Sequence, residues 1–127
     1  MVIDLFTLCD GAYNYNGKLT IVGTIDSITV PEVPAKIQFS IAMKLRFGTD
    51  EAGAHTLVVR IKDVNGKNIP PDMKLGLDIK PSDVSTIVSL AVNAQGLPFD
   101  KFGEYNVDVL VDDEVKGTYV FNIQKKS

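Results

Sequence analysis

The sequence predicts an all-β protein, a two-sheet antiparallel β-sandwich of about eight strands. Three observations support this: apolar and polar residues alternate along most of the chain, turn-forming pairs separate the alternating stretches, and no stretch is convincingly helical. The longest alternating stretch, residues 36–47, reads KIQFSIAMKLRF and has an apolar residue at every odd position. Successive side chains of a strand point to opposite faces, so this stretch is expected to be a long strand with one buried face.

The first half of the chain is divided by glycine and proline. Asn16-Gly17 closes a turn-rich segment and supplies the positive φ angles that tight hairpins require. Gly23 interrupts the next strand and indicates a bulge or a close approach of two backbones. Pro31 and Pro34 end that strand. The expected strands are residues 2–8, 19–30, 36–47, 54–63, 73–79, 84–92, 105–111 and 115–123.

The connections in the second half are expected to be mostly short. Asn65-Gly66 is a second hairpin signal. Residues 93–103 are expected to form a longer loop that plugs one end of the core through its large apolar side chains. Those side chains are Leu97, Phe99 and Phe102.

Length and composition indicate one folded domain over residues 1–127. The chain is 45% hydrophobic and 23% charged, and 127 residues suffice for a hydrophobic core that needs no disulfide bond or structural metal ion. Its net charge is -3 and its basic residues are dispersed, which argues against a nucleic-acid partner. No apolar run is long enough to span a membrane, and the first residues lack the basic flank of a secretory signal. We therefore expect a cytoplasmic protein without a membrane partner.

The sequence contains no catalytic or cofactor signature. His55 is the only histidine and Cys9 the only cysteine, so a dyad or a metal site could be imagined around them. We expect instead a plain strand-edge histidine and a small buried hydrophobe. The chain also lacks a phosphate-binding glycine loop and a Gly-x-Ser-x-Gly elbow. The expectation is a non-enzymatic binding or structural module without a cofactor.

An alternative function rests on acidic residues in the connections. In a sandwich whose strands all lie along one axis, alternate connections share one end, which here becomes an acidic pole. Hard cations take several oxygen ligands, so this pole suggests a calcium- or glycan-binding sandwich. Turns favour aspartate for local reasons as well, so the pole could be simply solvated. The acidic pole comprises Asp10, Asp50, Glu51, Asp83, Asp112, Asp113 and Glu114.

Two tyrosines alternate with asparagines in the first connection, at the same pole. Tyr13 and Tyr15 would suit protein or glycan recognition if exposed, since the ring gives contact area and the hydroxyl a polar handle. Alternatively, the rings fold down over the core edge. The outward faces of the strands are mixed rather than apolar, yet nothing blocks every sheet edge. A protein partner or a homodimer, formed by edge or face association, is therefore expected.

Two resemblances extend along the chain. The step Gly103-Glu104-Tyr105 resembles the tyrosine-bearing corner of immunoglobulin-like sandwiches. The chain as a whole resembles an uncharacterised prokaryotic family of small β-sandwich proteins. This resemblance implies a fold, no known activity and no catalytic residues. The residues that carry it are Cys9-Asp10, Gly17-Lys18-Leu19, Ile21, Gly23, Asp26, Ile28, Phe47, the segment 51–57, Asp63, Gly66 and Gly103-Glu104-Tyr105.

Overall fold

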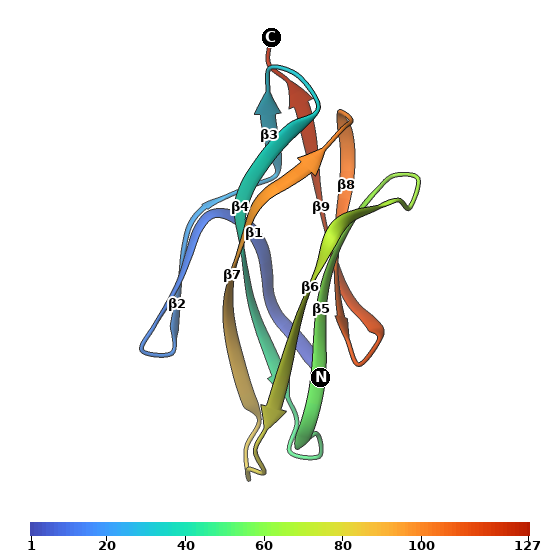
Figure 1. The fold of residues 1–127 in the computed structure, drawn as a ribbon. Coiled ribbons are helices and arrows are strands. Elements are labelled where there is room, and N and C mark those ends of the chain that lie inside the picture. The colour runs from blue at the N-terminus through green and yellow to red at the C-terminus, as the bar shows by residue number, and fades with distance from the viewer.

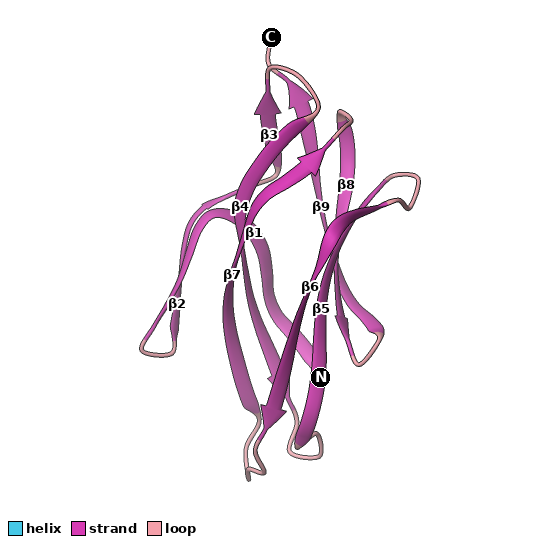
Figure 2. Cartoon of the chain, in the orientation of Figure 1, coloured by secondary structure: helices cyan, strands magenta, loops and turns pink.

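The computed structural model describes all residues from Met1 to Ser127, in nine strands and no helix (Figure 2). No helix is therefore present that could cross a bilayer. The strands are β1 (Val2–Tyr15), β2 (Lys18–Thr24), β3 (Ser27–Val30), β4 (Ala35–Phe47), β5 (Gly53–Asp63), β6 (Asn68–Ile79), β7 (Thr86–Phe99), β8 (Gly103–Val111) and β9 (Glu114–Lys125).

The strands form two sheets packed face to face (Figure 1). The four-stranded sheet has the order β2-β1-β4-β7, and the five-stranded sheet has the order β3-β9-β8-β5-β6. The prediction of an all-β, two-sheet protein is confirmed. Two details were wrong: there are nine strands, and β3 runs parallel to β9, so the five-stranded sheet is mixed.

The main core lies between the sheets, with β4 at its centre. The odd residues of β4 from Ile37 to Phe47 are at most 7% exposed, which confirms the predicted buried face. They meet the inward side chains of the five-stranded sheet. Near the start of β8, Tyr105 packs edge-on to Phe99, and its hydroxyl donates a hydrogen bond to the carbonyl oxygen of Lys101 at 2.8 Å. This is the tyrosine corner that Gly103-Glu104-Tyr105 suggested.

The predicted strand over residues 19–30 is divided between the two sheets. β2 pairs with β1, and after Thr24 the chain crosses to the other sheet, where β3 pairs with β9. Gly23, at φ 65°, lies beside Asp10, and a Cβ there would come within 2.5 Å of the Asp10 Oδ2 atom. The nearest atoms belong to the Asp10 side chain and not to a backbone, and the β1–β2 register continues unbroken past Gly23, so neither the predicted bulge nor the predicted close approach of two backbones is found. The feature that favours glycine here is the positive φ.

The first strand is longer than predicted. β1 pairs with β4 only as far as Cys9 and continues to Tyr15 paired with β2 alone, so the predicted loop after residue 8 is wrong. Residues 10–24, called here the β1–β2 hairpin, leave the plane of the sheet and turn back along its outer side (Figure 1). There the side-chain amide of Asn14 donates to the carbonyl oxygen of Ser89 in β7 at 2.9 Å.

The β1–β2 hairpin covers a second, smaller apolar cluster on the outer side of the four-stranded sheet. Cys9 and Ala42 point away from the main core, yet both are fully buried. Ala12 and the half-buried Leu19 and Ile21 of the hairpin pack against them. Cys9 is therefore the expected small buried hydrophobe, but in a local third layer and not in the main core.

The predicted loop over residues 93–103 is mostly strand. β7 continues to Phe99, and Gly96, at φ 66°, lies where the β4–β7 register shifts. Leu97 and Phe99 are buried as expected, because they now face the core from a strand. Phe102 is 39% exposed, so its predicted role as a core plug was wrong.

Candidate functional site

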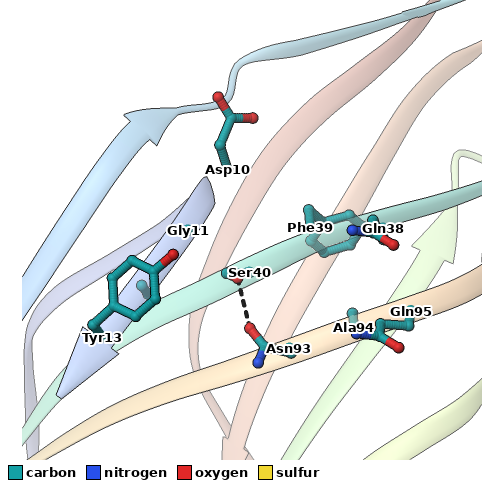
Figure 3. A pocket seen from close by; sticks show the side chains of 10 residues that line it. Asp10, Gly11, Tyr13, Gln38, Phe39, Ser40, Asn93, Ala94 and Gln95 are labelled. Atoms are coloured by element: carbon teal, nitrogen blue, oxygen red, sulfur yellow. Dashed lines mark hydrogen bonds between the residues drawn. The ribbon is translucent and has the colours of Figure 1, made fainter.

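A polar hollow of about 340 Å³ opens where β1 bends away from β4. It lies on the outer side of the four-stranded sheet, between the base of the β1–β2 hairpin and strands β4 and β7 (Figure 3). The residues that line it are Asp10, Gly11, Ala12 and Tyr13 of β1, Gln38, Phe39 and Ser40 of β4, and Asn93, Ala94 and Gln95 of β7.

The hollow results from two departures from regular pairing. β1 leaves β4 after Cys9, which pairs with Ser40, so the next outward side chain of β4, Gln38, has no strand beside it on that edge. On the other edge, Gln95 and Gly96 together oppose Gln38, because Ile37 pairs with Leu97 and Phe39 with Ala94. This bulge brings an extra β7 residue, Gln95, to the hollow.

Ser40 and Asn93 form the fixed floor of the hollow. The buried Ser40 hydroxyl donates to Oδ1 of Asn93 at 2.7 Å (Figure 3). Since the amide oxygen is held by this bond, both Nδ2 hydrogens of Asn93 stay available to a ligand. A strand-borne amide that a buried hydroxyl orients is a pre-organised hydrogen-bond donor.

Three more polar side chains border the hollow without an intramolecular hydrogen bond. They are Asp10, Gln38 and Gln95, and all three are exposed. Asp10 is the only charged residue of the lining, and no basic residue contributes to it. The hollow therefore offers amide donors and acceptors together with a single carboxylate.

Tyr13 and Tyr15 are 61% and 73% exposed, so neither ring folds down over the core. The Tyr13 ring lies over Gly11, where a Cβ would be 3.1 Å from the hydroxyl oxygen, and thereby borders the hollow (Figure 3). Tyr15 is further along the β1–β2 hairpin and is not part of the lining. The structure thus joins one of the two predicted tyrosines to a site.

Most of the acidic pole lies at one end of the sandwich, at the bottom of Figure 1. Asp10 does not, because it belongs to β1 and borders the hollow. The rest of the pole occupies three connections, namely Asp50 and Glu51 between β4 and β5, Asp83 between β6 and β7, and Asp112, Asp113 and Glu114 where β8 turns into β9.

His55 binds two of these connections together. Its Nδ1 lies 2.6 Å from Oδ2 of Asp112, and its Nε2 lies 2.7 Å from the carbonyl oxygen of Glu51. Both partners are acceptors, so the doubly protonated ring fits the site best. The Glu51 carbonyl and the Asp112 carboxylate accordingly raise the pKa of His55, and the hydrogen bond from His55 lowers the pKa of Asp112. The expected strand-edge histidine is in fact a bridge between two turns.

Glu51 is also used structurally. Its carboxylate accepts the Gly48 amide at 2.9 Å and pairs with the amino group of Met1 at 2.8 Å, and these hydrogen bonds lower its pKa. No group of three or more histidine, cysteine, aspartate or glutamate residues is arranged to hold a metal ion. The remaining members of the acidic pole are spread over three turns, and Glu51 and Asp112 are hydrogen-bonded within the fold.

Sequence reasoning missed four polar residues of the hollow, Gln38, Ser40, Asn93 and Gln95. Gln38 and Ser40 were correctly placed on the outward face of a strand, but nothing in the pattern separated them from other polar outward residues. Asn93 and Gln95 fell in a predicted loop. Only the β4–β7 register, which the sequence does not specify, brings these side chains to one place.

Fold and site together define a small two-sheet β-sandwich domain with a polar hollow on the outer side of one sheet. The chain belongs to a family of unknown function, DUF6941, whose model matches residues 4–124. None of the curated proteins matches its sequence.

Two solved structures align with most of this chain. A β-glucosidase from Listeria innocua in complex with glucose aligns over 94% of this chain, at 12% identity and a TM-score of 0.52. This chain spans 16% of the length of that enzyme, and the likeness concerns the fold alone. An immunoglobulin-like protein from Pseudomonas aeruginosa aligns over 97% of this chain and 95% of its own, at 13% identity and a TM-score of 0.41.

Proposed function

We propose that this protein is a non-enzymatic binding module that holds a neutral, polyhydroxylated ligand, a saccharide, in the hollow at the bend of β1. The observation that carries the proposal is the convergence of three amide side chains, one carboxylate and one exposed tyrosine on a single concave site. Its volume of about 340 Å³ suits a small ligand.

The chemistry of the lining favours hydroxyl groups. Each amide side chain offers both a donor and an acceptor, as each sugar hydroxyl does, and a carboxylate accepts from hydroxyls. An anionic ligand such as a phosphate would need a basic side chain, and none lines the hollow. Tyr13 adds a ring face for the apolar C–H side of a sugar and a hydroxyl for its polar edge.

The same lining supports binding without hydrolysis. Glycoside hydrolysis ordinarily uses a pair of carboxylic acids on either side of the scissile bond. Asp10 is the only acidic residue at the hollow, and His55 is engaged by Asp112 and Glu51 elsewhere. A ligand bound in the hollow would therefore contact one carboxylate, that of Asp10, and no second acid or base to act with it.

Calorimetric titration with a panel of neutral mono- and disaccharides tests the proposal. Asn93→Ala and Tyr13→Ala should each weaken binding by about tenfold or more, which is the loss of one or two good contacts. Tyr15→Ala and Gln124→Ala are matched controls, because they delete the same groups at exposed positions outside the hollow. Absence of binding to every saccharide, or equal losses in the controls, would contradict the proposal.

A protein partner is the second candidate function. The register of the β1–β2 hairpin places Tyr13, Tyr15 and Val22 on one face, and all three are more than half exposed. Rigid aromatic side chains on a protruding hairpin suit a protein contact. Under this alternative, Tyr15→Ala would lower affinity for the partner, whereas under the saccharide proposal it leaves saccharide affinity unchanged.

A further inference from the structure

β7 is a free edge of the four-stranded sheet and carries no charge. It pairs with β4 on one side only, and no backbone hydrogen bond reaches it from outside the regular sheets. Residues 84–99 contain no aspartate, glutamate, lysine, arginine or histidine. The β1–β2 hairpin reaches this strand through the bond from Asn14 to the Ser89 carbonyl.

The other sheet edges carry the features that usually prevent edge-to-edge pairing. β6 contains Pro70-Pro71 and the charged residues Asp72, Lys74 and Asp78. β3 has only four residues, and β2 is a short strand that begins with Lys18. Short edge strands, prolines and charged residues all disfavour pairing with another chain. β7, by contrast, has fourteen residues without a charge, and its one proline, Pro98, lies near its end.

The interior also reaches solvent beside β7. Between β6 and β7 the two sheets are not closed, and we call this opening the β6–β7 seam. Its inward β7 side chains Val88, Leu90 and Val92 are only half-buried, and Leu75 of β6 is 42% exposed. An apolar cavity of about 160 Å³ lies in the seam, lined by Leu57, Val59, Met73, Lys74, Leu75 and Val92.

We propose that a second copy of this chain covers β7, through antiparallel β7–β7 pairing about a twofold axis. The argument rests on charge. Near a twofold axis, a residue of the strand faces the same residue of the other copy, so a charged side chain there would face a like charge, which is destabilising. β7 has no charged side chain, so its pairing with a second β7 meets no such repulsion. Each β7 has one free edge, so the pairing closes at two copies and joins two four-stranded sheets into one of eight strands. The partner's Val88, Leu90 and Val92 then extend the apolar layer over the β6–β7 seam.

The proposal is tested by measuring the mass of the protein in solution by sedimentation equilibrium over a range of concentrations. The wild-type chain is compared with a variant that carries a lysine on the β7 edge. The wild-type chain should reach twice its 13.8 kDa mass. Ile87→Lys, at a 47% exposed side chain of β7, should weaken the dimer by about tenfold or more. Val120→Lys is the matched control, since it replaces an apolar side chain, 50% exposed, on β9 of the other sheet.

Amide hydrogen exchange keeps the proposal testable if Ile87→Lys does not fold. In the wild-type protein, protection of alternate β7 amides should rise with protein concentration, because every second residue bonds the partner. The proposal would be overturned by a monomer at all concentrations, by open-ended growth, or by a dimer that Ile87→Lys leaves intact. It would also be overturned if the concentration-dependent protection were confined to other strands.

Discussion

Gly23→Ala tests how the chain is held at the base of the β1–β2 hairpin. Gly23 has a φ of 65°, in the left-handed region that an alanine adopts only with strain. The new Cβ would also lie 2.5 Å from Oδ2 of Asp10. Since the Asp10 side chain is exposed, we expect its carboxylate to swing away, so that the backbone strain remains and the carboxylate leaves the hollow.

The expected loss of stability follows from that backbone strain. A left-handed conformation costs a residue with a Cβ about 1–2 kcal/mol. Unfolding entropy is about 2.1 cal/mol/K per residue near the melting temperature, so for this chain the strain corresponds to a decrease of about 4–7 °C. If the carboxylate moves freely, the decrease should be nearly the same in an Asp10→Ala background.

Thermal unfolding followed by circular dichroism, combined with saccharide titration, measures both effects. Gly17→Ala is the control, because Gly17 has a φ of 76° but no atom within 4 Å of an added Cβ. It should lower the melting temperature while leaving saccharide affinity unchanged, whereas Gly23→Ala should lower both. A Gly23→Ala protein with wild-type stability and wild-type affinity would refute the reasoning.

Two further predictions concern His55 and the third layer. Because folding raises the pKa of His55, the stability that the protonated ring contributes is complete below its ordinary pKa of 6.5 and is lost as pH rises through the pKa in the folded protein. The free energy of unfolding, measured in urea between about pH 6 and about pH 9, should therefore fall with pH in the wild type and fall less in His55→Gln. Equal pH profiles for the two proteins would contradict this prediction. Ala42→Leu should destabilise the protein by about 1–3 kcal/mol, because Ala42 is fully buried under the β1–β2 hairpin, and a variant as stable as the wild type would show that the hairpin does not pack there.

The period-two pattern predicted the layers well because burial imposes it directly. The alternation of residues 36–47 reflects one face against the core, and the structure buries that face throughout. The tyrosine corner at Tyr105 was also predictable, since its hydrogen bond to Lys101 is local in sequence. Features that depend on neighbouring residues or on a single buried face could therefore be inferred from the sequence.

The candidate site was less predictable because it depends on where pairing stops. The sequence indicated that Gly23 is special, but not that the chain changes sheets after it or that Asp10 lies beside it. The acidic-pole hypothesis assumed straight strands and simple alternation of the connections, and the bend of β1 breaks that assumption for Asp10. Gln95 reaches the hollow through a register shift, which side-chain patterns do not encode.

The most direct test of the proposed site is a titration of the ¹⁵N-labelled protein with the best-binding neutral saccharide, followed by NMR. The account predicts that the side-chain amide signals of Gln38, Asn93 and Gln95 shift together, while signals around His55 stay in place. Shifts that gather around His55, or no shift at the hollow at saturating saccharide, would contradict it.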